Sequence, residues 1–159
     1  RLSRVIANYD WDYKKGKKPE DTSKKYWEVD VWIENQRWHK PWNYELEQNL
    51  NKDEKKKIKE QAWAEQAHTI AEVGSTYTIQ GFDLNYVGVI LGPSVKYRNG
   101  EIIFDPTESH NHKATRNRTL GDGSKQKFGE LLIQHEVRVL MTRGVNGVYI
   151  YACDEQLRE

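Results

Sequence analysis

Cysteine is nearly absent from this chain, since Cys153 is the only one among 159 residues. A lone cysteine excludes an intrachain disulfide, and sparse cysteine is typical of proteins from reducing compartments. We therefore expect a cytoplasmic protein without disulfides.

Long apolar runs are also missing. No stretch approaches the roughly 20 apolar residues of a membrane-spanning helix, and no charged and then apolar leader opens the sequence. These absences predict a soluble protein with no membrane partner. The sequence starts at Arg1 rather than at methionine, directly before a predicted strand, which predicts a piece of a longer protein.

Two features of nucleotide hydrolysis are lacking. The chain has no Gly-x-x-x-x-Gly-Lys-Ser/Thr loop to cradle phosphates, and no apolar strand that ends in paired acids to hold Mg²⁺. We therefore expect that this chain alone does not hydrolyse nucleoside triphosphates. Neither sign of charge dominates, because 25 basic residues face 24 acidic ones, so bulk charge neither favours nor excludes a nucleic-acid partner.

The residues that are present predict one α/β domain over residues 1–159. Strand character appears at residues 5–7, 26–33, 73–78, 86–91 and 148–151. The run 86–91 is nearly continuous in apolar residues, as in a parallel strand covered on both faces. Helices predicted over residues 52–67, 130–142 and 154–159 alternate with the strands, so we expect a mostly parallel sheet flanked by helices.

Three connecting segments have their own signals. Residues 35–43, which include Pro41, are expected to be irregular. Asn99-Gly100 between two apolar runs predicts a β-hairpin at residues 95–104, because this dipeptide tolerates the two positive φ angles of a type I′ turn. Residues 110–129 are polar and predict a long flexible loop.

Two segments about fifty residues apart carry the functional signal. Residues 73–91 contain a strand, a polar turn with Gln80, Gly81 and Asp83, and a second apolar strand. Residues 139–144 place Arg143, preceded by Thr142, at the end of a helix and before another strand. Each pattern is weak alone, and their ordered occurrence is informative.

These segments resemble two helicase motifs. The sequence TYTIQGFD at residues 76–83 resembles motif V of superfamily 1 helicases, and VLMTRG at 139–144 resembles their motif VI. With PWN at 41–43, EVG at 72–74, YVGVI at 86–90 and GVYIY at 147–151, the chain is similar to a bacterial Schlafen-like ATPase/helicase family designated domain of unknown function 2075. The resemblance covers roughly residues 1–155. Gly144 departs from the alanine of many superfamily 1 members, which looks like a subfamily trait.

The resemblance implies a RecA-like second helicase lobe, of the P-loop NTPase type, with the hairpin at 95–104 as an insertion. It implies ATP with Mg²⁺ as the cofactor of the full-length protein, and single-stranded DNA or RNA as the partner. The phosphate loop and the Mg²⁺ ligands would come from an N-terminal domain of the same polypeptide.

The resemblance also implies roles for individual residues. Asp83 accepts a hydrogen bond from a ribose hydroxyl, with Gly81, Gln80 and Thr142 around the nucleotide. Arg143 is the arginine finger, whose planar fork neutralises charge on the γ-phosphate in the transition state. The resemblance assigns nucleic-acid contacts to three hydroxyl-bearing residues before the turn: Thr76, Tyr77 and Thr78. Gln80 links the two sites through the turn.

Plainer interpretations remain open for the same residues. Asp83 fits a turn acid, and Arg143 fits a partner for the dipole at a helix C-terminus. Trp38 and Trp42 are the candidates for base stacking, although large aromatic residues also supply the core of a small domain. The histidines at 110 and 112 lack a convincing third metal ligand.

A locally positive loop is a further candidate for phosphate contact, with a solvated loop as the alternative. Its basic residues are Lys113, Arg116, Arg118, Lys125 and Lys127. We conclude that the sequence favours the second lobe of a nucleic-acid-dependent NTPase or helicase. The alternative is a non-catalytic nucleic-acid-binding or interaction module that keeps the helicase fold.

Overall fold

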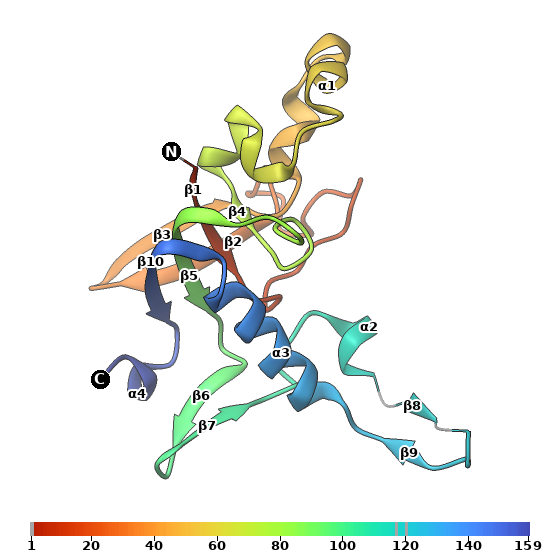
Figure 1. The fold of residues 1–159 in the computed structure, drawn as a ribbon, viewed down its shortest axis with the longest axis vertical. Helices are drawn as coiled ribbons and strands as arrows, with labels where there is room; N and C mark the ends of the chain where they lie inside the picture. Colours follow the sequence, from red (N-terminus) through yellow and green to blue (C-terminus); the bar gives the residue numbers. More distant parts are fainter. Residues whose placement is uncertain (1, 117, 120) are drawn as a thin grey trace.

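A four-stranded parallel sheet organises the fold (Figure 1). The computed structural model describes residues 2–116, 118–119 and 121–159. The strand order is β10-β5-β1-β4, and each neighbouring pair is parallel. The strands are β1 (Ser3–Ala7), β4 (Val73–Gly74), β5 (Leu84–Leu91) and β10 (Gly144–Ala152). The predicted α/β class with a parallel sheet is confirmed, and the predicted strand at 73–78 is shortened to two residues.

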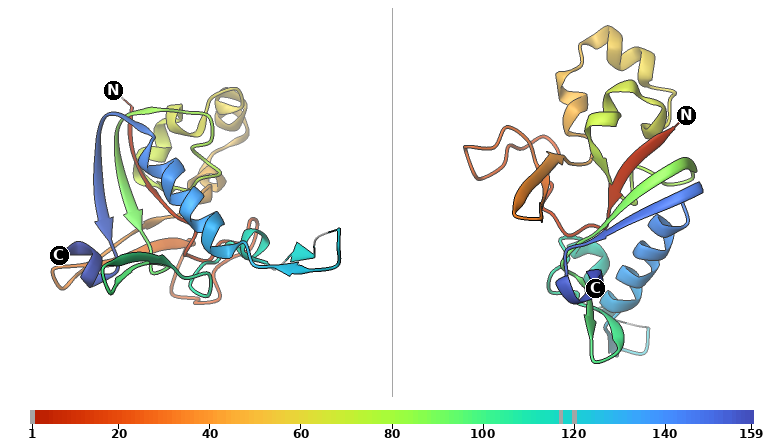
Figure 2. Two further views of the ribbon diagram at one scale, coloured as in Figure 1. Left: turned by 60° about the horizontal axis from the view of Figure 1, so that its bottom comes forward. Right: turned by 90° about the vertical axis from the view of Figure 1, so that its left-hand side faces the viewer.

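Helix α3 (Gly129–Met141) covers one face of the sheet (Figure 2). Its apolar residues recur at helical spacing, and Ile133 and Leu140 are buried in one cluster with Val87 and Val89 of β5. The predicted helix at 130–142 is confirmed because this stripe matches the 3.6-residue period and the sheet supplies its partner surface.

A β-hairpin, rather than a helix, packs on the other face. Strands β2 (Glu28–Ile33) and β3 (Gln36–Pro41) pair antiparallel, and Val29 and Val31 join Ala7 and Ile90 in a second buried cluster. The prediction of an irregular segment at 35–43 was therefore wrong. Glu34 and Asn35 adopt φ angles of +46° and +64°, which close a tight turn, and Pro41 is tolerated because it is the last residue of its strand.

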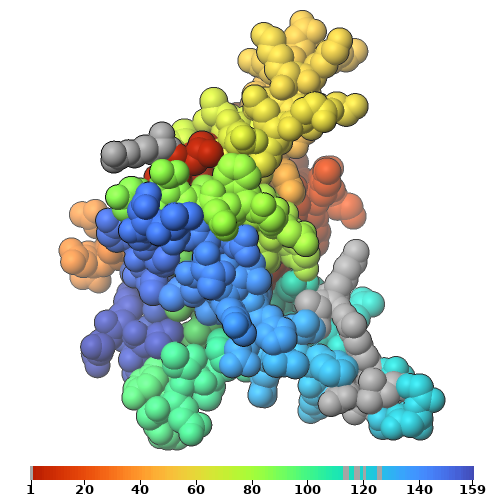
Figure 3. All heavy atoms as spheres, viewed as in Figure 1, coloured from red at the N-terminus to blue at the C-terminus, as the bar shows by residue number. Residues whose placement is uncertain are grey.

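The lysine-rich segment forms one short helix that stands away from the sheet (Figure 1), and its atoms project from the rest of the surface in the space-filling view (Figure 3). Helix α1 (Lys52–Ile58) starts at a capping box built by Asn51 and Glu54, and it buries none of its residues. The predicted helix at 52–67 was too long because Trp63 turns into the core and donates its indole N–H to Glu72 at 2.8 Å. Three 3-10 segments surround this turn: η1 (Glu45–Asn49), η2 (Trp63–Glu65) and η3 (Ala67–Ala71).

The hairpin of β6 (Val95–Arg98) and β7 (Glu101–Phe104) confirms the Asn99-Gly100 prediction, with φ angles of +51° and +88° at the two residues. Short elements occur in the segment predicted as a flexible loop: α2 (His112–Thr115), β8 (Arg118–Thr119) and β9 (Lys125–Gln126). Two residues of that segment, 117 and 120, lie outside the described residues, as do the side chains at 113, 118 and 125. A role of this basic loop in phosphate contact stays a prediction.

Helix α4 (Glu155–Arg158) follows β10.

Trp42 is expected to be a main determinant of stability. Its side chain is fully buried and contacts the rings of Tyr9 and Trp11 at centroid distances of 5.4 and 6.2 Å. Trp42→Ala should lower the free energy of unfolding by about 3–5 kcal/mol through the cavity it leaves. Trp32 is 63% exposed, so the control Trp32→Ala should stay within about 0.5 kcal/mol. Chemical denaturation measures both, and equal losses would contradict this assignment.

Candidate nucleotide and nucleic-acid site

Asp83 and Arg143 lie side by side at the amino ends of two neighbouring strands. Asp83 immediately precedes β5 and Arg143 immediately precedes β10. The backbone N–H of Leu84 donates to the carbonyl oxygen of Arg143 at 2.8 Å, and Arg143 Nη1 lies 3.3 Å from Asp83 Oδ1. The structure therefore brings together two candidate residues that the sequence separates by 60 positions.

The guanidinium of Arg143 is shared between Asp83 and the end of α3. Its Nε donates to the carbonyl oxygen of Val139 at 3.1 Å, which satisfies one of the free carbonyl groups at the helix C-terminus. Arg143 is therefore a hydrogen-bond partner of the helix C-terminus, as the plainer interpretation expects, and it contacts Asp83 at the same time. Because the Asp83 side chain is 64% exposed, its ion pair stabilises the fold by roughly 0–1 kcal/mol. Arg143 can therefore leave Asp83 at little cost.

The turn before Asp83 requires its glycine. Phe82 N–H donates to the carbonyl oxygen of Ile79 at 3.1 Å, and Gly81 has a φ of +74°, which L side chains rarely adopt. Ile79 is fully buried and anchors the turn, while Gln80 and Gly81 are exposed. No described atom lies within 4 Å of the position that a Cβ at Gly81 would take, so this surface is open to a ligand.

The structure explains why position 144 is glycine rather than alanine. A Cβ at this position would lie 2.4 Å from the carbonyl oxygen of Gly147 and 2.9 Å from side-chain carbons of Val148 and Val87. The crowding comes from a shift of register in β10 between Gly144 and Gly147. The irregularity directly after Arg143 thus excludes any side chain.

The three hydroxyl residues predicted to touch nucleic acid have different environments. Thr78 is buried, and its hydroxyl exchanges hydrogen bonds with the backbone N–H and C=O of Ser75, so it is engaged within the turn. Thr76 donates to Glu136 Oε1 at 3.1 Å. Tyr77 is 53% exposed and accepts a hydrogen bond from Asn111 Nδ2. Of the three, Tyr77 offers the most surface to a partner.

The two tryptophan candidates for base stacking differ as well. Trp42 is fully buried, so its interpretation as a stacking platform is corrected: the side chain belongs to the core. Trp38 is half-buried beside the second core cluster and lines an apolar crevice with Ile33 and Tyr149. Stacking by Trp38 stays a prediction.

Glu136 is a residue that the sequence reasoning missed. It lies on the buried face of α3, accepts the backbone N–H of Tyr9 at 2.9 Å and the hydroxyl of Thr76, and is 9% exposed. Burial raises the pKa of its carboxyl group to about 7. The available signal was a charged residue within the apolar stripe of Ile133, Val137 and Leu140.

The histidines at 110 and 112 lie near each other, and His110 also contacts an acid from the start of the chain. His110 Nδ1 lies 2.9 Å from Asp12 Oδ1, and the two imidazole rings are 5.7 Å apart. Among the described residues, no group of three or more His, Cys, Asp and Glu side chains is arranged to hold a metal ion. Within the same part of the chain, no helix is both long and apolar enough to cross a membrane.

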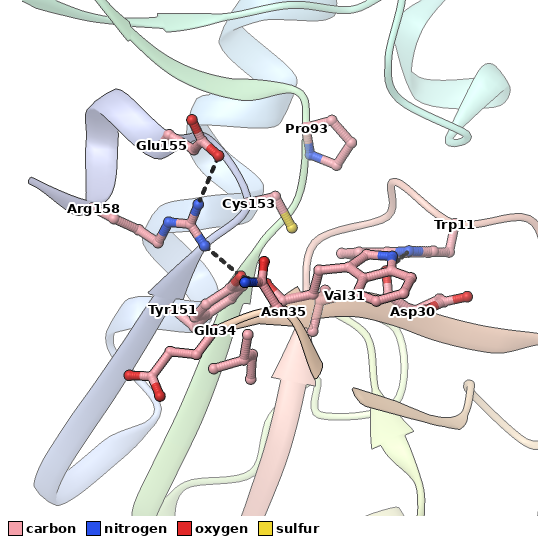
Figure 4. Close-up of a pocket in the computed structure, with 12 residues that line it drawn as sticks. Trp11, Asp30, Val31, Glu34, Asn35, Pro93, Tyr151, Cys153, Glu155 and Arg158 are labelled. Carbon is pink, nitrogen blue, oxygen red and sulfur yellow. Dashed lines mark hydrogen bonds and ion pairs between the residues drawn. The ribbon is translucent and has the colours of Figure 1, made fainter. Parts of the chain in front are cut away.

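A separate cavity of about 740 Å³ lies at the opposite, carboxyl edge of the sheet (Figure 4). It opens between the tip of the β2–β3 hairpin and α4. The hydroxyl of Tyr151 donates to the backbone oxygen of Trp32 and accepts from Arg158 Nη1 at 2.6 Å, which ties the hairpin tip to α4. This cavity is distinct from the surface around Asp83 and Arg143.

We predict that Gly144→Ala lowers the free energy of unfolding by about 1–3 kcal/mol, because the new methyl group meets backbone that cannot move aside. Gly121→Ala is the control, since nothing described lies within 4 Å of the corresponding Cβ position there. Thermal or chemical unfolding measures both variants. An unchanged Gly144→Ala protein would show that the register shift in β10 relaxes freely.

Glu136 should make the fold less stable at high pH. Its pKa is raised from 4.5 to about 7, so the folded state holds this proton more tightly than the unfolded state. The resulting stabilisation, on the order of 3 kcal/mol, is complete below about pH 4.5 and is lost as the pH rises through 7. Glu136→Gln should therefore flatten the dependence of unfolding free energy on pH.

A slope should remain in that variant, because burial also raises the pKa of Glu72 to about 7. Glu60→Gln, at an exposed position, is the matched control and should leave the profile unchanged. Denaturant titrations between pH 4.5 and 8 provide the measurement. Parallel profiles for wild type and Glu136→Gln would contradict the assignment.

Comparison with known proteins places the chain in a family. Residues 1–154 match the sequence model of a family described as Schlafen group 3, DNA/RNA helicase domain. A segment of 99 residues is 46% identical to the uncharacterised protein YPL245W of Saccharomyces cerevisiae, and it covers 61% of this chain and 22% of that relative. The chain thus matches about a fifth of the relative's length. No solved structure matches.

The Schlafen-like, helicase-related resemblance is confirmed by this match, while the bacterial family designated domain of unknown function 2075 stays a prediction. The observations that agree with the match are the parallel sheet and the shared position of the two motif-like segments at its amino edge. Because residues 1–154 match its sequence model, this chain belongs to the Schlafen group 3 DNA/RNA helicase domain family.

Proposed function

We propose that this domain is the RecA-like second lobe of a nucleic-acid-dependent NTPase of the helicase type. In this proposal Asp83 binds the ribose of ATP and Arg143 is the arginine finger. The phosphate loop and the Mg²⁺ ligands come from an N-terminal domain of the same polypeptide. The observation that carries the proposal is the contact of Asp83 with Arg143 at one edge of the sheet, 3.3 Å apart.

The chemistry of the two side chains suits the two ends of a nucleotide. A carboxylate accepts hydrogen bonds from ribose hydroxyls, and a guanidinium fork matches phosphate oxygens. The open surface at Gly81 leaves room for the sugar beside Asp83. The Mg²⁺ ion would neutralise phosphate charge in the complete cleft, while the residues of this lobe orient the nucleotide and stabilise the transition state.

Energetics favour the release of Arg143 from Asp83 during turnover. The exposed ion pair contributes at most about 1 kcal/mol. An arginine finger raises the rate by about 10³–10⁵, which corresponds to roughly 4–7 kcal/mol of transition-state stabilisation. In this proposal the loss of the ion pair with Asp83 is small beside the stabilisation that Arg143 gives to the transition state.

Helix α3 offers a route between the nucleic-acid and nucleotide ends of the lobe. Glu136 holds Thr76 at one position of the helix, and Arg143 lies seven residues further on, a rise of about 10 Å. A shift of Thr76 on contact with a phosphate would act on the same rigid element that ends at Arg143. This arrangement supports nucleic-acid-stimulated hydrolysis better than a passive binding module.

Replacement of Arg143 in the full-length protein tests the proposal. Arg143→Ala should reduce kcat by at least about 10² with a much smaller change in nucleotide affinity, because the contact forms only in the transition state. Arg143→Lys should restore little activity, since a point charge on a flexible stem does not reproduce the planar fork. Steady-state ATPase kinetics with saturating nucleic acid provide the measurement.

Arg138→Ala is the matched control, because Arg138 is an exposed arginine near the end of the same helix. It should leave kcat close to that of the wild type. A folded Arg143→Ala protein with wild-type kcat would refute the arginine finger and would favour the non-catalytic nucleic-acid-binding or interaction module.

A further inference from the structure

Nine lysines are concentrated in two short segments that lie far apart in the sequence. Residues 14–18 carry four lysines and no acid, and residues 52–59, which form α1 and its C-cap, carry five lysines and two acids. The whole chain is balanced, with 25 basic and 24 acidic residues. The positive charge is therefore a local property of these two segments, and such a distribution is typical of a surface that binds a polyanion.

The fold brings the two segments together around one recess, which we name the lysine groove. It has a volume of about 350 Å³, and its lining includes lysines of both segments: Lys15, Lys17, Lys18 and Lys55. None of these four lysines forms an ion pair with a described residue, whereas the adjacent Lys14 pairs with Glu20 at 2.9 Å. Their ammonium groups therefore stay available to a ligand.

The two acids that line the lysine groove do not neutralise it. Glu45 is 6% exposed, and its Oε2 accepts the backbone N–H of Trp27 at 3.0 Å. Burial raises the pKa of its carboxyl group, so burial opposes the negative charge of Glu45. The other acid, Glu47, is half-buried. Two carboxyl groups against four ammonium groups leave the groove positive.

Stability of the fold does not explain this charge. Helix α1 buries none of its residues and stands away from the sheet (Figure 1). Lysines in its last turn favour the helix dipole, but Lys52 in the first turn opposes it. Lys52 also lies four residues before Lys56, and like charges at this spacing destabilise a helix. The four lysines at residues 14–18 lie in a loop, where no helix dipole acts on them.

We propose that the lysine groove binds the phosphate backbone of a nucleic-acid strand, with ammonium groups from residues 14–18 on one side and from α1 on the other. Each lysine that neutralises a phosphate releases condensed counterions, and this release drives the binding. Tyr13 and Tyr44 line the same groove, and Lys15 Nζ lies 5.8 Å from the ring centre of Tyr44. Aromatic rings beside basic groups suit a single strand, whose bases stack without sequence preference.

The observations favour a nucleic acid over other polyanions. Contact with an anionic membrane needs an apolar face beside the basic one, and Ile58 is the only apolar residue of α1. An acidic peptide matches the lysines, but it has no bases to stack on Tyr13 and Tyr44. Membership in a DNA/RNA helicase domain family also favours a nucleic acid.

The lysine groove would be a further contact beyond the residues before the Gly81 turn, because none of residues 76–78 lines it. Helix α1 lies beyond the amino edge of the sheet, the edge that carries Asp83 and Arg143 (Figures 1 and 2). A strand held there would lie on the nucleotide side of the lobe. The inference rests on the nucleic-acid part of the proposed function and is independent of the arginine finger.

Fluorescence anisotropy of the full-length protein with a labelled oligothymidylate of about 20 nucleotides tests the proposal. Lys17→Gln/Lys55→Gln removes one ammonium group from each side of the groove. Its affinity in about 0.1 M salt should fall at least tenfold. The slope of log affinity against log salt should become less steep by about 1.4, since each phosphate contact with a single strand contributes about 0.7.

Lys40→Gln/Arg138→Gln is the matched control, because it also removes two exposed positive charges, one from β3 and one from α3. It should leave the salt slope unchanged and the affinity within about twofold of the wild type, since salt screens distant charges. The melting temperature of Lys17→Gln/Lys55→Gln should also stay unchanged, because both lysines are exposed. Weaker binding by that variant therefore reports a lost contact and not a loss of folding.

The outcomes separate this inference from the proposed function. If the wild type binds and Lys17→Gln/Lys55→Gln keeps its affinity and salt slope, the lysine groove alone is overturned. If the wild type does not bind the oligothymidylate, the groove and the nucleic-acid part of the proposed function are both overturned. Tighter binding of an oligoglutamate of equal length would overturn a nucleic acid as the partner.

Discussion

The pairing of β10 with β5 is the interaction on which the candidate site depends. The two strands run parallel, so the residues that enter them meet at the same edge of the sheet. The hydrogen bond from Leu84 N–H to the carbonyl oxygen of Arg143 fixes that meeting point. A different register in β10 would separate Asp83 from Arg143, and the glycines at 144 and 147 allow the register that is observed.

Helix α3 packs against the sheet through buried residues from its first turn to its last, so it reaches from one edge of the sheet toward the other. Ile133 and Leu140 bury its apolar stripe, and between them the carboxyl group of Glu136 is placed among Tyr9 and Thr76. A buried carboxylate with two hydrogen bonds is costly in an apolar face unless those bonds are maintained. The two hydrogen bonds of Glu136 therefore restrict the position of α3 on the sheet. Because Arg143 follows the end of this helix, they also restrict the position of Arg143.

The two edges of the sheet have opposite physical character. At the amino edge Asp83 is exposed, and its ion pair with the partly buried Arg143 contributes roughly 0–1 kcal/mol. At the carboxyl edge Asp10 is buried, and its Oδ2 accepts the backbone N–H of Ser94.

The sequence by itself determined what depends on near neighbours in the chain. The Asn99-Gly100 hairpin follows from backbone conformations of two residues, and α3 follows from apolar spacing. The motif-like segments made Asp83 and Arg143 the candidate site residues, and their roles stay predictions. Tertiary structure alone decided that Trp42 is core, that residues 36–41 pair as a strand, and that Gly144 excludes a side chain. It also decided the hydrogen-bond partners of Glu136 and Asp10, because those partners come from segments tens of residues away, and no local pattern encodes such contacts.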